Sequence, residues 1–250
     1  MTETTDREGV TVHTMNHVLG QGPVYYAALP RDIRIPTGRA TNKEETRCRL
    51  VSALWDHLMA LDSTLGKCCR YPARDMDPIR VARDQLGKPH LLRGEFRGPA
   101  ISFSGGGGNV WAALSGDESD LGIDVALAEE FHGDYPVHRV FHPEELHHAL
   151  RVAGGDREHA SALLWSAKEA VVKALGCAFH LVEPRHVTVC PSAEGWAGVD
   201  GGYTFRVGLS GKALARYPLA VSRSLRVRSL PQNNRWLSIA VLNREPTGYE

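Results

Sequence analysis

The chain has 250 residues, of which 42% are apolar and 23% charged, and this composition is typical of a globular protein with one large core or two smaller ones. Its 29 basic and 29 acidic residues give a formal charge of zero, so no overall attraction to nucleic acid or to a membrane is expected. No apolar run is long enough to span a bilayer, the polar N-terminus is unlike a secretory signal, and the five cysteines lack metal-ligand spacing. We therefore expect a cytoplasmic protein with reduced thiols.

The first half is predicted to contain one helix and several strands. Residues 1–22 are predicted to form a flexible tail, and a polar connection is predicted over 30–41. Leucines at helical spacing predict a helix that Thr41 or Asn42 caps and that runs to about Ala60. Strands are predicted over 24–29, 79–85, 100–104, 109–114 and 121–127.

The second half repeats this order of helices followed by strands. Pro143 favours a helix start within 138–146, and a second helix is predicted over 157–175, where no proline occurs and Gly176 can end it. Strands are predicted over 187–190, 203–209, 219–227 and 236–242. The pattern predicts an α+β fold, divided into the tail 1–22, an N-terminal half 23–128 and a C-terminal half 129–250.

Two stretches carry carboxylates in settings that suggest a site. Asp124 lies in the apolar strand 121–125, where an acid is costly unless it is paired, hydrogen-bonded or bound to a cation. Glu169 and Lys173 are four residues apart on the predicted helix and share one face. Alone, that pair is typical of an ordinary surface ion pair. Together with Asp124 it suits Mg²⁺ and a phosphorylated ligand.

Three further features bear on a possible site, and the second and third have two interpretations each. Lys88 stands between Gly87 and Pro89, which restrict the local backbone. The segment Ser102-Phe103-Ser104 is followed by four glycines, which form either a flexible hairpin turn or an anion nest of backbone N–H groups. Arg47, near the start of the first helix, is either on a solvated face or in contact with a phosphate or an adenine.

Five motifs, in this order, resemble those of the Sfp-type 4′-phosphopantetheinyl transferases. The combination of the third and the fifth is the specific one, because the glycine-rich and Gly-Lys-Pro segments are weak signals alone. The motifs are Gly87-Lys88-Pro89, Ser102-Phe103-Ser104-Gly105, Gly122-Ile123-Asp124-Val125, Phe141 to Glu145, and Trp165-Ser166-Ala167-Lys168-Glu169-Ala170-Val171-Val172-Lys173.

The resemblance implies a pseudo-dimer of two similar α+β halves, each with helices packed on a small, mostly antiparallel sheet, and an active site in the cleft between them. It implies transfer of phosphopantetheine from coenzyme A to a serine of an acyl or peptidyl carrier protein, with release of 3′,5′-ADP. Mg²⁺ would be held by Asp124 and Glu169, Glu169 would also be the base, and Lys173 would contact the pyrophosphate. The other predicted coenzyme A contacts are Lys88, Pro89, Ser102, Phe103, Ser104 and Lys168 from the motifs, and Arg47 from its place near the start of the first helix. A two-copy chain is expected to act as a monomer.

The sequence departs from the family pattern at two positions. Phe103 stands where the family usually has a histidine that contacts a coenzyme A phosphate, and His90 or the glycine-loop amides are the candidate substitutes. Ala126 stands where many bacterial members have a third metal-binding glutamate, so two protein carboxylates and water are expected on the metal. These departures motivate an alternative, a relative that binds coenzyme A or a carrier protein without efficient transfer. A scaffold protein is a third hypothesis, and it would leave Asp124 as a costly unpaired acid.

Overall fold

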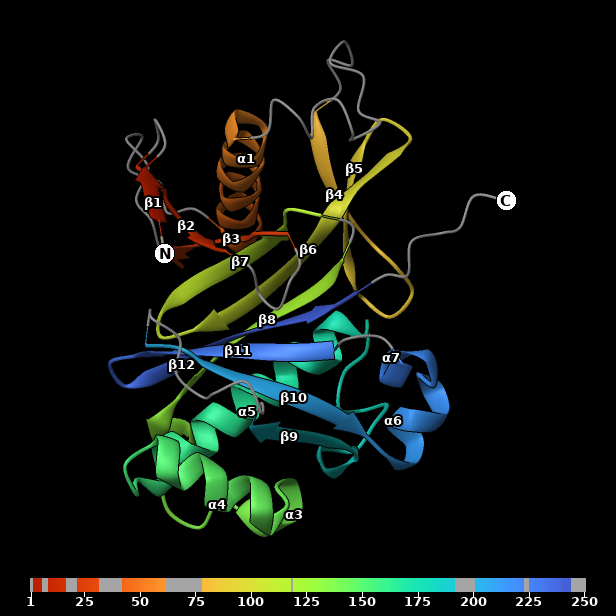
Figure 1. The fold of residues 1–250 in the computed structure, drawn as a ribbon. Helices are drawn as coiled ribbons and strands as arrows, with labels where there is room; N and C mark the ends of the chain where they lie inside the picture. Colours follow the sequence, from red (N-terminus) through yellow and green to blue (C-terminus); the bar gives the residue numbers. More distant parts are fainter. Residues whose placement is uncertain are drawn as a thin grey trace.

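The computed structural model describes residues 2–5, 9–16, 22–31, 42–61, 78–117, 119–191, 201–222 and 225–243. They form two stacked antiparallel sheets with helices on both outer faces (Figure 1). The first sheet has the strand order β1-β2-β3-β7-β6-β5-β4. Its strands are β1 (Thr2–Thr5), β2 (Thr11–Met15), β3 (Val24–Pro30), β4 (Ile79–Arg83), β5 (Pro89–Arg93), β6 (Phe96–Gly106) and β7 (Asn109–Ser115).

The second sheet has the order β8-β12-β11-β10-β9. Its strands are β8 (Asp120–Leu127), β9 (Val187–Pro191), β10 (Tyr203–Leu209), β11 (Leu225–Gln232) and β12 (Arg235–Leu242). The helices are α1 (Lys43–Leu61), α3 (Val137–Val140), α4 (Pro143–Val152), α5 (Arg157–Ala174), α6 (Gly211–Arg216) and α7 (Leu219–Ser222), with 3₁₀ turns η1 (Ala128–Phe131) and η2 (Pro184–His186). None of the described helices is long and apolar enough to cross a membrane.

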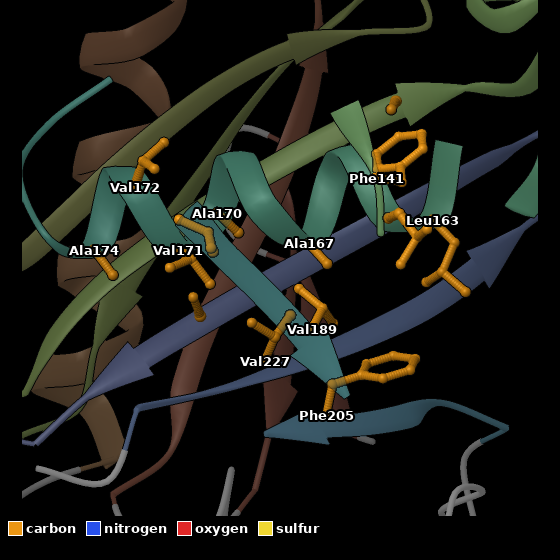
Figure 2. Close-up of a cluster of buried hydrophobic side chains, with 14 of the residues drawn as sticks. Phe141, Leu163, Ala167, Ala170, Val171, Val172, Ala174, Val189, Phe205 and Val227 are labelled. Atoms are coloured by element: carbon orange, nitrogen blue, oxygen red, sulfur yellow. The ribbon is translucent and has the colours of Figure 1, made fainter. Parts of the chain in front are cut away.

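Three apolar layers hold the sheets and helices together. Leu50 and Leu54 of α1 pack on the outer face of the first sheet. Trp111 of β7 and Ile239 of β12 belong to the layer between the two sheets. Val171 of α5 lies in the third layer, between this helix and the second sheet (Figure 2). The two sheets therefore share one buried face, and the loops and strand ends at its edge are where a cleft can form.

Two glycines let the elements of the site approach closely. A Cβ atom on Gly122 of β8 would lie 2.0 Å from the carbonyl oxygen of Ala170, so only glycine allows α5 this close to β8. A Cβ atom on Gly106 of β6 would lie 2.8 Å from the carbonyl oxygen of Val125. The strand β8 is thus held between β6 on one side and α5 on the other.

The observed architecture confirms the α+β class, with helices packed on two antiparallel sheets. Two local predictions were wrong, and two elements were missed. Residues 2–5 and 11–15 of the predicted tail are strands that pair with the first sheet. The predicted strand 219–227 is α7 followed by β11, and β5 and α6 were not predicted. β8, placed in the N-terminal half, pairs with β12 in the second sheet, so we propose the division between β7 and β8 instead.

Candidate active site

Asp124 is a buried carboxylate with partners from two other elements. Its side chain is 11% exposed, and its Oδ1 accepts hydrogen bonds from Ser104 Oγ at 2.8 Å and from Lys173 Nζ at 2.7 Å. The ammonium of Lys173 also donates to the carbonyl oxygen of Ile123 at 3.1 Å. The sequence motifs on β6, β8 and α5 therefore meet at one point. Because Asp124 is paired within the chain, the cost of an unpaired acid no longer argues against a scaffold protein.

The two serines of Ser102-Phe103-Ser104 join the sheets. Ser102 Oγ accepts a hydrogen bond from the backbone N–H of Ile123 at 3.1 Å, and Ser104 Oγ accepts one from Val125 at 3.3 Å. Alternate residues of a strand point to the same face, so both hydroxyls face β8 while Phe103 faces the other way. The segment thus brings Asp124 to the boundary between the two halves, and Ser104 also orients its carboxylate.

Glu169 lies one helical turn before Lys173 on α5. Burial raises the pKa of its carboxyl, the Lys173 ammonium opposes this shift, and the charge of Asp124 adds to it. A carboxylate with a raised pKa is a stronger base than an ordinary one. In the described part of the chain no cluster of three or more His, Cys, Asp or Glu side chains is placed to hold a metal ion. The two carboxylates that were predicted to hold Mg²⁺ are Asp124 and Glu169, and a set of two carboxylates is compatible with this ion because it commonly keeps several waters.

A third carboxylate, Glu130 of η1, was not singled out from the sequence. Burial raises the pKa of Glu130, and the charge of Asp124 raises it further. The two carboxylates are therefore close enough for electrostatic repulsion between them, although Glu130 is exposed. The buried side chain of Ala126 offers no ligand. Glu130 follows β8 closely in the sequence but was not assigned to the site, because its proximity to Asp124 depends on how η1 packs against α5.

A cavity of about 220 Å³ lies next to Lys173 and is lined from both halves of the chain. The N-terminal half contributes α1, the β4–β5 turn and β6, and the C-terminal half contributes the end of α5 and the residues after it. The lining residues are Arg47, Arg83, Leu86, Gly87, Lys88, Pro89, Ile101, Ser102, Phe103, Lys173, Gly176, Cys177 and Ala178. Five predicted coenzyme A contacts besides Lys173 are brought together here, while Ser104 and Lys168 are not among the lining residues. Arg83 and Cys177 were missed.

Arg47 and Phe103 form a pair on the wall of this cavity. The guanidinium carbon of Arg47 lies 5.3 Å from the centroid of the Phe103 ring, within the range of a cation–π contact. Arg47 Nη1 also lies 3.3 Å from Glu44, and its buried Nε has no hydrogen-bond partner among the residues that the structure describes. The sequence left the role of Arg47 open, and this geometry favours a ligand contact over a solvated face.

His90, a candidate substitute for the missing histidine, is not among the residues that line this cavity. It accepts a hydrogen bond from Arg97 Nη2 at 2.6 Å and lies 3.4 Å from Asp84. It lines a neighbouring hollow of about 660 Å³ together with Arg97 and Arg216. Burial and the charge of Arg97 lower the pKa of His90, so it is a neutral side chain near pH 7.

Lys88 lines the cavity but its ammonium has partners in the other half. Nζ lies 2.8 Å from Asp120 Oδ1 and donates to the carbonyl oxygen of Ala174 at 3.0 Å. It therefore fastens the start of β5 to the start of β8 and the end of α5. Gly176, at a φ of +76°, ends α5 beside it, where a Cβ atom would lie 3.0 Å from Lys88 Cδ.

Lys168 occupies a different place from the one that the resemblance implied. Its side chain is completely buried, 2.9 Å from Glu145 Oε2, and it also donates to the carbonyl oxygens of Pro184 at 3.0 Å and Val187 at 2.5 Å. Glu145 in turn accepts a hydrogen bond from the N–H of Val189 at 2.6 Å. Lys168 therefore joins α5 to α4 and β9, and it makes no contact with the cavity. The expected cofactor role gives way to a structural one.

Comparison with known proteins agrees with the family suggested by the motifs. Residues 120–221 match the family model ACPS, the 4′-phosphopantetheinyl transferase superfamily. The matched segment contains Asp124, Glu169 and Lys173. The predicted family is therefore confirmed at the level of the superfamily. A match to this superfamily also supports a transferase. The model does not separate the Sfp type from the holo-acyl-carrier-protein synthase type. A search of curated proteins finds no match.

Solved structures of this superfamily resemble about half of the chain. An ACPS–CoA complex from Chronobacterium ammoniagenes is 20% identical, with a TM-score of 0.42, and covers 52% of this chain and 100% of its own. The holo-[acyl-carrier-protein] synthase from Neisseria meningitidis is 20% identical, with a TM-score of 0.40, and covers 50% and 98%. The acyl carrier protein synthase from Mycobacterium tuberculosis is 23% identical, with a TM-score of 0.35, and covers 50% and 97%.

Proposed function

We propose that this protein is an Sfp-type enzyme that transfers 4′-phosphopantetheine from coenzyme A to a serine of an acyl or peptidyl carrier protein. The observation that carries the proposal is the ion pair of Asp124 and Lys173 beside a cavity lined with cations, with Glu169 one helical turn from Lys173 and within electrostatic reach of both. The superfamily match over the same residues gives independent support. Both halves line the cavity within one chain, which supports a monomeric enzyme.

The cavity is suited to the nucleotide part of coenzyme A. Arg47, Arg83 and Lys88 provide positive charge for phosphate groups, and Phe103 provides an apolar wall. Arg47 takes over the phosphate contact for which the family usually uses a histidine at position 103. Lys173 lines the same cavity and would contact the pyrophosphate.

Asp124 and Glu169 would hold Mg²⁺, which supplies charge stabilisation to the phosphoryl oxygens when bound. Lys173 adds a second positive charge beside Asp124. Ser104 keeps the Asp124 carboxylate in place through its 2.8 Å hydrogen bond. Glu169, with its raised pKa, accepts the proton of the acceptor serine. Positioning and electrostatics of this kind account for most catalysis of phosphoryl transfer.

The test is the intact mass of an apo carrier protein after incubation with this protein, coenzyme A and Mg²⁺, with EDTA in a parallel sample. One transferred phosphopantetheine adds about 340 Da, and EDTA should abolish the gain because the metal is required. Asp124→Ala and Glu169→Gln should each lower the rate by about a hundredfold or more. Glu144→Gln, on the exposed part of α4, is the matched control and should act as wild type.

The alternative is a relative that binds coenzyme A without efficient transfer. It predicts that coenzyme A raises the melting temperature, as a ligand of the native state does, while no carrier protein gains mass. Transfer at normal rates by the Glu169→Gln variant would remove Glu169 from the mechanism. The absence of both binding and transfer would refute both assignments.

A further inference from the structure

The loop that closes the β6–β7 hairpin has no side chains and lies between two guanidinium groups. It consists of Gly105, Gly106, Gly107 and Gly108, and we refer to it as the glycine loop. A Cβ atom built on Gly105 would lie 2.6 Å from Nη2 of Arg31, and one built on Gly107 would lie 2.6 Å from Nη1 of Arg235. Both guanidiniums therefore rest directly on the bare backbone, one from each half of the chain.

Within the described parts of the chain, the contacts of these two arginines are with uncharged groups. Arg235 lies over the Trp111 ring, with its guanidinium carbon 5.1 Å from the centroid, and the backbone N–H of Arg31 donates to the carbonyl oxygen of Gly108 at 2.9 Å. Among the described residues, neither guanidinium forms an ion pair with a carboxylate. This includes the nearby carboxylates of Glu129 and Glu130, which follow β8. Arg31 is exposed to solvent. Such a surface is suited to carboxylates, which arginine binds in a bidentate manner.

The glycine loop lies on the opposite side of Asp124 from the cavity. Along β6, Phe103 lines the cavity, Ser104 contacts Asp124, and Gly106 packs against Val125, the residue after Asp124. Toward the other end of β8, Lys88, which also lines the cavity, contacts Asp120 at the start of this strand. The cavity, the carboxylates and the glycine loop therefore follow one another along β8.

This order matters because phosphoryl transfer is an in-line displacement, with the attacking oxygen opposite the leaving group. If 3′,5′-ADP occupies the cavity, the acceptor hydroxyl must approach from the side of the glycine loop. We propose that the glycine loop, Arg31 and Arg235 form the docking surface for an acidic segment of the acceptor protein beside its serine. The inference rests on the proposed function. Because the glycines carry no side chains, the backbone of the acceptor can come close to the loop, and the two arginines set its orientation.

The experiment compares wild type with the double variant Arg31→Glu/Arg235→Glu. The control is Arg80→Glu, which reverses the charge of an exposed arginine on β4. Binding of a fluorescently labelled apo acyl carrier protein is measured by anisotropy, and the Michaelis constants for carrier and coenzyme A are measured separately. A second carrier, in which the acidic residues flanking the serine are changed to amides, is used with each protein.

We expect the double variant to weaken carrier binding and raise the carrier Michaelis constant by at least about tenfold, as charge reversal at an electrostatic interface does. The melting-temperature increase given by coenzyme A should be unchanged, and the variant should no longer distinguish the two carriers. Unchanged carrier binding would refute the docking surface. Loss of coenzyme A stabilisation would instead show that the arginines bind the nucleotide. If wild type transfers nothing, the proposed function fails, while the anisotropy arms still decide the docking surface.

Discussion

The buried ion pair between Lys168 and Glu145 allows a sharp test of whether a motif lysine is structural. Lys168→Met keeps the apolar stem but removes the ammonium. Glu145, only 1% exposed, would then keep its charge with no cation beside it. The carbonyl oxygens of Pro184 and Val187 would each lose a buried donor.

Removing one partner of a buried pair costs about 3–5 kcal/mol. For a chain of this size, 1 kcal/mol corresponds to roughly 2–4 °C, so the melting temperature should fall by roughly 6–20 °C. The double variant Lys168→Met/Glu145→Leu should lose less than the sum of the two single variants, because it leaves no unpaired charge. It will not reach wild-type stability, since Val189 loses the acceptor of its N–H group.

The free energy of unfolding is measured by urea denaturation, followed by circular dichroism. Coenzyme A stabilisation and transfer are measured below the transition, where the variant is folded. We expect the coenzyme A Michaelis constant to change less than twofold, or about 0.4 kcal/mol. A variant with wild-type stability and poor coenzyme A binding would show that Lys168 acts on the cofactor and that the structural reasoning is wrong.

The same pair predicts a pH effect in Glu145→Gln. Burial lowers the pKa of Lys168 below its ordinary value of 10.5, and the Glu145 charge opposes that shift. Without the Glu145 charge, the pKa of Lys168 in the folded state falls further. The unfolded chain then binds the Lys168 proton more tightly than the folded chain does. The free energy of unfolding of this variant should therefore rise, relative to wild type, as the pH is raised from neutral toward 10.5. A difference that is constant with pH would contradict this.

Variants at three further positions test other parts of the structure. Gly122→Ala should separate α5 from β8 and lower stability by about 1–3 kcal/mol, measured in urea, and an unchanged midpoint would contradict the close approach. Asp156→Ala removes the cap that accepts from two N–H groups of α5. The two hydrogen bonds lower the pKa of Asp156, and the cap stabilises the folded chain by about 1 kcal/mol. This stabilisation should be complete at pH values above the ordinary pKa of 3.8, and it should disappear as the pH falls through the folded-state pKa. Phe103→Leu should raise the coenzyme A Michaelis constant about two- to fivefold, because Arg47 loses its aromatic partner, whereas Phe103→His should be tolerated.

Long, regular elements were predictable from the sequence. The helix predicted over 157–175 is α5 (Arg157–Ala174), and the strand predicted over 121–127 is β8 (Asp120–Leu127). Asn42 caps α1 as expected, accepting from the N–H groups of Glu44 and Glu45. Periodicity and capping are local properties, so one sequence is enough to find them. The strand β2 was missed because Thr11 and His13 gave it the polarity of a tail, and its buried side became visible only on pairing with β3.

The site was predictable as a set of residues but not as an arrangement. Ser104, Asp124 and Lys173 lie together because three motifs from distant parts of the chain converge, as the resemblance implied. Lys168, next to Glu169 in sequence, points to the opposite side of α5 and is buried there. The pairing of Arg47 with Phe103 depends on how α1 lies on the first sheet. Adjacent residues on a helix face different directions, and only tertiary packing decides which face reaches the ligand.

The cavity draws its walls from the first sheet with α1 and from the end of α5, which packs on the second sheet. The two sheets are joined by the short connection from Ser115 to Asp120. Such a tether keeps the halves at an effective concentration in the millimolar range or above, so they find each other whatever the amount of protein present. A site of the same design divided between separate chains would come apart on dilution. Here the cleft should persist in a single molecule, and its specific activity should be independent of enzyme concentration down to the lowest level that an assay can detect.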